Sequence, residues 1–140
     1  MSVDRRRLFL LCTAFAAAAA GPALGQDYPN RPITIVVPAA AGSFTDDAAR
    51  IVGQRLAERL RKPVVIDNRP GANTVIGVEY LIKQKPDGYT LMFTASTVHA
   101  ANPSLLKKLS YHPLRDFTPI ARVGQVPFIV AVTNSIPAKN

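Results

Sequence analysis

Cysteine, tryptophan and histidine are almost missing from this sequence. Cys12 is the one cysteine among 140 residues, tryptophan is absent, and the two histidines are His99 and His112. A lone cysteine excludes an intrachain disulfide and a cysteine-based metal site. Neither histidine belongs to a recognisable metal-ligand pattern, because such sites need several converging side chains. We therefore expect no metal and no other cofactor.

Recognisable catalytic motifs are missing as well. The chain has no G-x-S-x-G nucleophile elbow, no Walker loop and no G-x-G-x-x-G dinucleotide fingerprint. His99 follows Ser96 by three residues, which suits a base and its nucleophile. No third group is placed to orient such a pair. The sequence therefore predicts no catalytic residue and favours a protein that is not an enzyme.

Acidic residues are the scarcer charge class, with 9 Asp and Glu against 17 Lys and Arg and a formal net charge of +8. Basic residues gather at 55–62 and at Lys107–Lys108, whereas the aromatic residues lie mostly elsewhere. A nucleic-acid surface interleaves basic residues with stacking aromatics. We interpret the basic clusters as solvated surface and expect no nucleic-acid partner.

No hydrophobic run in the sequence is long enough to span a bilayer, and the longest run lies near the N-terminus. Basic Arg5–Arg7 precede the uncharged stretch Leu8–Ala20, which is shorter than the roughly 20 residues that span a bilayer as a helix. Small residues in Ala23–Gly25 suit a cleavage site. The pattern predicts a signal peptide at 1–25 and an exported chain at 26–140 that is not embedded in the membrane. The general secretion route is favoured over the twin-arginine route, which the paired arginines also resemble.

The rest of the sequence alternates short β-branched runs with amphipathic stretches, a pattern that indicates an α/β fold with a mostly parallel sheet. An alternative is a hairpin turn at Asp87–Gly88, but the preceding residues lack strand alternation. The expected strands are Ile33–Val37, Val64–Ile66, Thr90–Phe93, Phe117–Val123 and Phe128–Thr133, and the expected helices are Asp46–Leu60, about Val75–Lys83 and Val98–Leu109, the last interrupted near Pro103.

Two loops that leave expected strands are candidate binding segments, because ligands collect beyond the carboxyl ends of strands in open α/β sheets. The first, 38–46, ends at a helix N-terminus, where free N–H groups favour an anion. Ser43 or Thr45 can cap that helix, and capping alone is an equally good explanation of the segment. Asp46 would repel an anion if it faced the site, but as part of a cap it would point into the backbone. The second loop, 94–98, offers hydroxyl groups, a weaker signal on its own.

Several motifs occur in a fixed order along the chain: Tyr28-Pro29-x-Arg31-Pro32-Ile33, the loop and helix with Pro38, Gly42, Thr45-Asp46 and Arg50, Asn68-Arg69-Pro70-Gly71-Ala72, Pro86-Asp87-Gly88-Tyr89-Thr90-Leu91, Asn102-Pro103 and Tyr111-x-Pro113-x-x-Asp116-Phe117. In this respect the sequence strongly resembles the Bug family, the periplasmic solute receptors of tripartite tricarboxylate transporters. The resemblance covers essentially all of 26–140.

The resemblance implies a type II periplasmic-binding-protein-like fold of two α/β lobes, of which this chain is the incomplete first lobe and the start of the crossover to the second. It implies a small carboxylate as ligand (a di- or tricarboxylate, an amino acid or an aromatic acid) and a membrane permease as partner. The ligand carboxylate is expected at backbone N–H groups of both loops, and the candidate ligand-binding residues are Ala40, Ala41, Gly42, Ser43, Phe44, Thr45, Asp46, Thr94, Ala95, Ser96, Thr97 and Val98.

The sequence departs from the family pattern at two places. Phe44 stands where a glycine is usual and either narrows the pocket or stacks on the ligand. Asn73-Thr74 replaces a usual glycine pair, which we interpret as a surface change. Two other functions stay open: a truncated remnant without function, and an enzyme on a similar two-lobe fold.

Overall fold

The computed structural model describes residues 28–127 and 133. The predicted signal peptide and all but one residue of the strand expected at Phe128–Thr133 lie outside these residues. Within the described part of the chain, no helix combines the length and the apolar character that crossing a membrane requires.

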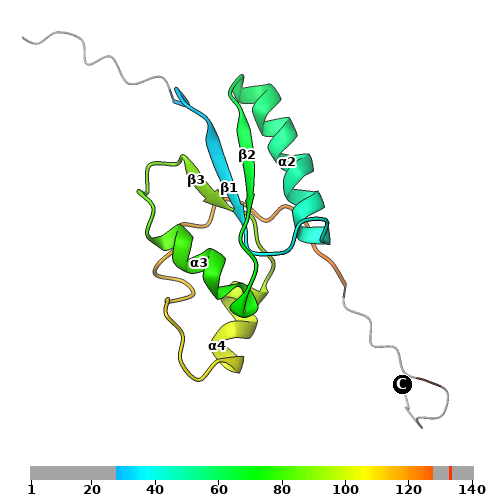
Figure 1. Ribbon diagram of the computed structural model, residues 1–140, viewed down its shortest axis with the longest axis vertical. Coiled ribbons are helices and arrows are strands. Elements are labelled where there is room, and N and C mark those ends of the chain that lie inside the picture. The colour runs from blue at the N-terminus through cyan, green and yellow to red at the C-terminus, as the bar shows by residue number, and fades with distance from the viewer. Residues whose placement is uncertain (1–27, 128–132, 134–140) are drawn as a thin grey trace, which may run out of the picture.

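Three parallel strands form the sheet, in the order β2-β1-β3 (Figure 1). They are β1 (Ile33–Val37), β2 (Val64–Asn68) and β3 (Thr90–Met92). Ile35 of β1 lies opposite Ile66 on one neighbour and Leu91 on the other. The β-branched runs thus form strands where the sequence predicts them. The hairpin at Asp87–Gly88 is excluded, because the residues that lead to this turn form helix α3 (Val75–Ile82) and not a strand that could pair with β3.

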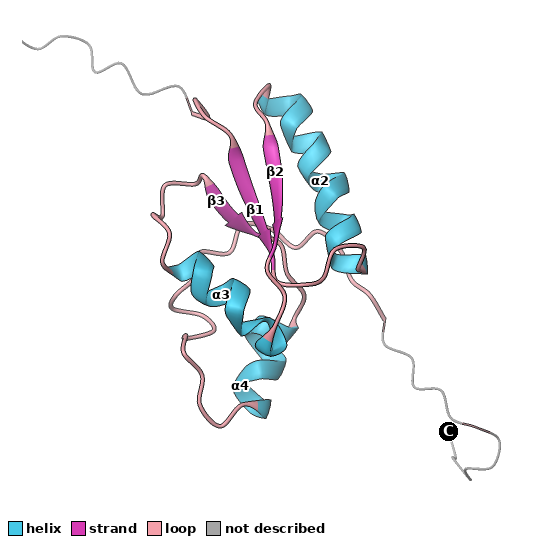
Figure 2. Cartoon of the chain, in the orientation of Figure 1, coloured by secondary structure: helices cyan, strands magenta, loops and turns pink. Residues whose placement is uncertain are grey.

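Helical segments connect and follow the strands (Figure 2). They are α2 (Phe44–Leu60), a 3₁₀ turn (Ala72–Thr74), α3 (Val75–Ile82), a π-helical turn (Thr97–Ala101) and α4 (Asn102–Leu105). The expected α/β class and its β-α-β-α-β order are confirmed. Most boundaries shift by only one or two residues, but the last helical stretch ends at Leu105, well short of Leu109.

The strand expected at Phe117–Val123 is wrong. This segment has no regular secondary structure, and every residue from 118 to 127 is exposed. Apolar residues favour a strand only when a neighbouring strand and a covering layer are present to pack against them. No described segment supplies that layer here.

The order of the strands places the two long helices on opposite faces of the sheet. The chain moves from β1 to β2 on one side and then returns past β1 to β3, so right-handed crossovers put α2 and α3 on different faces. Side-chain packing agrees: Ile35 and Val37 pack with Ala49 of α2, whereas Met92 packs with Val78 of α3. The central strand is therefore covered on both sides, which its almost uninterrupted burial reflects.

The buried face of α2 differs from the expected one. The sequence assigns Ile51 to the same apolar stripe as Ala49, but Ile51 is 65% exposed. The residues of α2 that are buried are Asp46, Ala49 and Gly53. The small residues Ala49 and Gly53 let the helix lie close to β1 and β2, and Ile51 points away from the sheet.

Candidate functional site

Two loops meet at the carboxyl edge of the sheet, one after β1 and one after β3. Their strands are direct neighbours, and the Phe93 N–H donates to the Val36 carbonyl (3.0 Å) where β3 gives way to its loop. From β1 the chain first adds β2 on one side of β1 and then adds β3 on the other side. The place between β1 and β3 is therefore the topological switch point of the sheet. In open α/β sheets such a switch point is where ligands bind. The two loops singled out in the sequence therefore lie side by side.

The first loop is a compact turn capped by Ser43. The Ser43 side chain accepts a hydrogen bond from the Asp46 N–H (3.3 Å), and the Ser43 carbonyl accepts one from the Asp47 N–H (2.9 Å). Of the two caps that the sequence allows, Ser43 is confirmed. Gly42 adopts a φ of 77°, a left-handed conformation that glycine takes without strain.

The first turn of α2 keeps free backbone donors. No hydrogen bond joins the N–H groups of Phe44 and Thr45 to any protein acceptor in the part of the chain that the structure describes. Such groups at the start of a 17-residue helix carry partial positive charge, which favours an anion. The Phe44 ring beside them is 69% exposed and lies at the rim of the loop.

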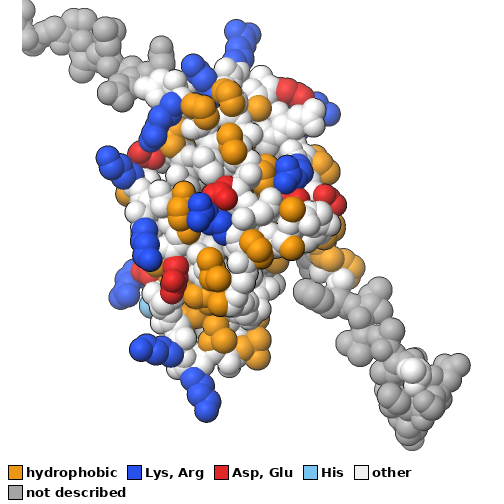
Figure 3. Space-filling view, in the orientation of Figure 1, with side chains coloured by type: hydrophobic (Ala, Val, Ile, Leu, Met, Phe, Trp, Pro, Cys, Tyr) orange, Lys and Arg blue, Asp and Glu red, His pale blue; other side chains and the backbone are white. Residues whose placement is uncertain are grey.

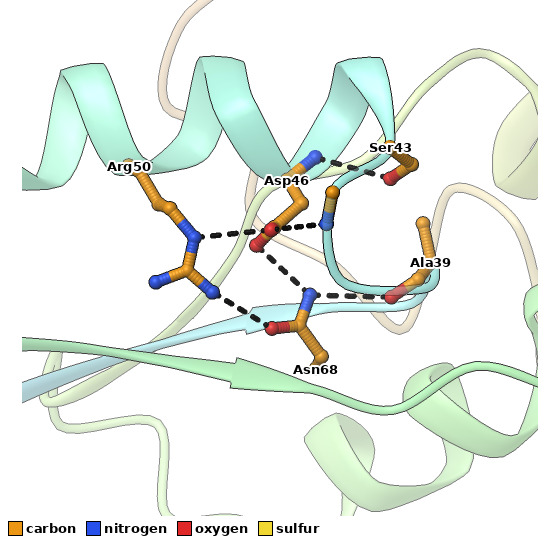
Figure 4. Close-up of polar contacts among 6 residues, drawn as sticks. Ala39, Ser43, Asp46, Arg50 and Asn68 are labelled. Atoms are coloured by element: carbon orange, nitrogen blue, oxygen red, sulfur yellow. Dashed lines mark hydrogen bonds and ion pairs between the residues drawn. The ribbon is translucent and has the colours of Figure 1, made fainter.

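Asp46 is turned into the loop (Figure 4). Its carboxylate accepts hydrogen bonds from the Gly42 N–H (2.8 Å), Arg50 Nε (3.0 Å) and Asn68 Nδ2 (3.0 Å), and the residue is only 1% exposed. These bonds, with the Gly42 N–H first, lower the pKa of Asp46 to about 2, against the opposing effect of burial. The carboxylate is therefore ionised at neutral pH and neutralised by Arg50. This is the arrangement expected of a cap rather than of a group that repels an anion.

The second loop leads from β3 into the π-helical turn. Ala95 and Ser96 are exposed, and Thr94 and Thr97 are half-buried. Val98 is fully buried, and its carbonyl accepts a hydrogen bond from the Tyr111 hydroxyl (2.9 Å). The hydroxyl and N–H groups of this loop that reach solvent thus come from its first four residues.

His99 is not placed as a base for Ser96. Its Nδ1 lies 2.6 Å from the Pro113 carbonyl oxygen, and its ring stacks edge-on against Phe117. A carbonyl only accepts hydrogen bonds, so Nδ1 carries the proton. The His99 ring anchors the segment after α4. His99 and Ser96 therefore do not form the pair of base and nucleophile that their spacing along the chain suits.

Three residues that hold the loops in place were missed as site residues. Arg50 lies one helical turn after Asp46, and Asn68 is the last residue of β2. Both contact the Asp46 carboxylate. Asn102 is fully buried and bonds to Asn73 and Thr74. The i, i+4 spacing of Asp46 and Arg50 was a visible signal, but nothing local identifies either asparagine.

Asn73 and Thr74 are more than a surface change. The backbones of Ala72, Asn73 and Thr74 have φ values of 45°, 52° and 76°, a left-handed region that is costly for residues with a Cβ. Glycines at such positions carry no strain. The buried Asn102 amide holds this segment through the Asn73 carbonyl (2.8 Å).

Charge is dispersed over the molecular face that Figure 3 shows. Lys and Arg side chains are scattered over the face shown in Figure 3, with acidic side chains among them and apolar patches between. This agrees with the interpretation of the basic residues as solvated surface. Among residues 28–127 and Thr133, no three His, Cys, Asp or Glu side chains gather where they could hold a metal ion.

Comparisons with known proteins point to the same family. Residues 48–140 match the family described as the tripartite tricarboxylate transporter family receptor, TctC. Protein BugT of Bordetella pertussis is 40% identical over 135 residues, which are 94% of this chain and 41% of that protein. A UPF0065 protein of Bordetella bronchiseptica is 40% identical over 126 residues, 90% of this chain and 38% of that protein. The chain thus spans about two fifths of the length of these curated relatives.

Solved structures share the fold. Rpa4515 of R. palustris, solved with adipate, superposes with a TM-score of 0.60 at 38% identity, over 62% of this chain and 29% of that chain. MatC (Rpa3494) from Rhodopseudomonas palustris, with bound malate, gives a TM-score of 0.59 at 36% identity, over 66% of this chain and 31% of that one. The expected family, fold class and partial coverage of a longer fold are therefore confirmed, and the chain belongs to the TctC family of tripartite tricarboxylate transporter receptors.

Proposed function

We propose that this chain supplies the first part of an exported receptor that captures a small carboxylate. The observation that supports the proposal is the pair of unpartnered N–H groups at Phe44 and Thr45, which lie at the switch point beside the loop that follows β3. Backbone N–H groups at a helix start recognise a carboxylate by its charge and its two oxygens. The ligand contacts proposed come from the loops 40–46 and 94–98, and within them from residues other than Asp46 and Val98, which are buried.

The proposal extends to location and partners. We place 1–25 as a leader that is removed and 26–140 as the first lobe of a two-lobe receptor, delivered to the periplasm, most simply by general secretion. A solved relative described as a periplasmic transporter superposes with a TM-score of 0.56, which supports that location. Capture at the loops is followed by closure of the second lobe and delivery to a membrane permease. The receptor acts by binding and performs no reaction.

Ligand binding by the purified chain tests the proposal. Adipate and L-malate, the ligands named with the two solved relatives, are titrated by calorimetry and in thermal melts, and adipamide serves as the uncharged analogue. A carboxylate that occupies the loops raises the melting temperature, because a ligand at about 100 times its Kd adds about 2.7 kcal/mol of stability. Adipamide is expected to have no effect. If no carboxylate in a panel of mono-, di- and tricarboxylates binds, the proposal that these two loops capture a carboxylate fails.

Phe44 is expected to set which carboxylate is preferred. Replacing it with glycine removes an exposed ring beside the free N–H groups. We expect the ratio of the Kd values for adipate and L-malate to change by about threefold or more, because apolar contact with a ligand contributes about 25 cal/mol per Å². Ile51→Ala is the control, since Ile51 is 65% exposed on the same helix but points away from the sheet. An unchanged ratio in Phe44→Gly would remove this ring from the pocket.

A further inference from the structure

Asn68 uses its whole side-chain amide to join three parts of the fold (Figure 4). Its Nδ2 group donates to Asp46 Oδ1 (3.0 Å) and to the Ala39 carbonyl (3.2 Å), and its Oδ1 accepts from Arg50 Nη2 (3.2 Å). A rotated amide would place oxygen against two acceptors, so only one orientation satisfies all three partners. The end of β2 is thereby tied to the loop after β1 and to helix α2.

These bonds reach the backbone donors that the proposed function uses. Ala39 is near the start of the loop, and Asp46 holds the Gly42 N–H at its turn (2.8 Å). Fixing both points fixes the direction of the N–H groups of Phe44 and Thr45. We propose that Asn68 is a positioning residue for carboxylate binding, acting through Asp46 and Ala39 without touching the ligand. This inference rests on the proposed function.

Asn68→Asp separates positioning from a purely structural role. In this variant the ionised carboxylate at position 68 would lie beside the Asp46 carboxylate and the Ala39 carbonyl oxygen, and both would repel it. Protonation would restore one donor at nearly the same place. The charged groups around position 68 are Asp46 and Arg50 from α2 and the ion pair between its two chain neighbours, Asp67 of β2 and Arg69 just after β2 (2.8 Å). The packed segment 33–41 of β1 and its loop carries no titratable side chain. The defect in the variant should therefore follow the protonation of the new carboxyl group.

The experiment measures the Kd of adipate and of L-malate for wild-type and Asn68→Asp chains between about pH 5 and about pH 8. For each ligand, the Kd of the variant is divided by the Kd of the wild type at the same pH. The titration of the ligand itself cancels in this ratio. We expect binding about tenfold weaker or more in the variant at the upper end, and a ratio that falls as the pH is lowered. Asn68→Ala, which cannot recover a donor, should show a loss that does not depend on pH.

Asn30→Asp is the matched control for the added charge. Asn30 lies before β1, and its Oδ1 accepts from the Tyr89 hydroxyl (2.9 Å), which a carboxylate can also do. The Kd of Asn30→Asp, divided by the wild-type Kd, should stay near one at every pH. A ratio near one for Asn68→Asp throughout the range, or the same loss independent of pH in both Asn68 variants, would overturn the inference while leaving the receptor proposal intact.

A readout without ligand keeps the two proposals apart. In ¹⁵N spectra, the amide resonances of Gly42, Phe44 and Thr45 should shift with pH in Asn68→Asp and stay fixed in Asn30→Asp. If the wild type binds neither adipate nor L-malate, the proposed function loses its support for these ligands, but this amide pattern still supports the positioning of the loop. Amides that do not respond to pH in Asn68→Asp would contradict the positioning itself.

Discussion

Replacing Gly77 with alanine is expected to lower the free energy of unfolding by about 2 kcal/mol, although alanine is the better helix former. A Cβ at position 77 of α3 would lie 2.7 Å from Pro38 Cβ and 3.0 Å from both Pro38 Cα and the Arg69 carbonyl oxygen. The Arg69 oxygen and Pro38 Cα are backbone atoms and the Pro38 ring is rigid, so relief requires a shift of the whole helix. The measurement is urea unfolding of the two purified chains, followed by circular dichroism.

Gly53→Ala is the matched control for Gly77→Ala. Gly53 lies inside α2, and a Cβ there would meet only side-chain ends, Ile66 Cδ1 at 3.2 Å and Val64 Cγ1 at 3.4 Å. These methyl groups can move by small rotations, so the gain in helix propensity of up to about 1 kcal/mol offsets the crowding. We expect a change within about 0.5 kcal/mol. Gly77→Ala as stable as the wild type would show that α3 does not lie this close to Pro38.

Gly77 also bears on the binding site, because Pro38 begins the loop that follows β1. A displaced Pro38 would move the loop relative to the start of α2. A weaker carboxylate affinity is therefore expected to accompany the loss of stability. In this fold the packing of α3 on one face of the sheet and the shape of the loop at its carboxyl edge depend on the same contact.

The parts of the fold that the sequence predicts are those with local signals. The run Ile33–Val37 is β-branched and forms β1, and the apolar spacing that follows Ser43 forms α2. The two loops were found because strands that alternate with helices must place their carboxyl ends at one edge of the sheet. The Ser43 cap was found because capping is a contact within four residues.

The contacts that hold the loops were not predictable in this way. Asn68 is 22 residues from Asp46, and Asn102 is 29 residues from Asn73, so no spacing along the chain connects them. The strand expected at Phe117–Val123 failed for a related reason, since strand formation depends on neighbours that the pattern of one segment does not specify. Long-range polar contacts and strand partners are both properties of the assembled fold.

Loss of the Asn102 side chain is expected to be the other severe defect. Asn102 is fully buried, and its amide donates to the Asn73 carbonyl (2.8 Å), the Thr74 hydroxyl (3.2 Å) and the Tyr111 hydroxyl (3.1 Å). Asn102→Ala leaves these acceptors without their donor at the place of a fully buried side chain. Each buried group without a partner costs about 1–3 kcal/mol. We therefore expect the free energy of unfolding to fall by about 3 kcal/mol in urea unfolding.

The effect should be concentrated on the left-handed segment at Ala72–Thr74, because the Asn102 amide opposes the tendency of these backbones to relax. Amide hydrogen exchange at Val75 and Ile76, which follow this segment, should accelerate more than exchange in β1. Asn102→Asp keeps the volume but removes the donors, so at neutral pH it should be at least as unstable as Asn102→Ala. Ser104→Ala, at an exposed position of the same short helix, should change stability by less than about 0.5 kcal/mol. A stable Asn102→Asp chain with unchanged exchange at Val75 would mean that shape alone, and not this hydrogen-bond network, holds the loops beside the proposed site.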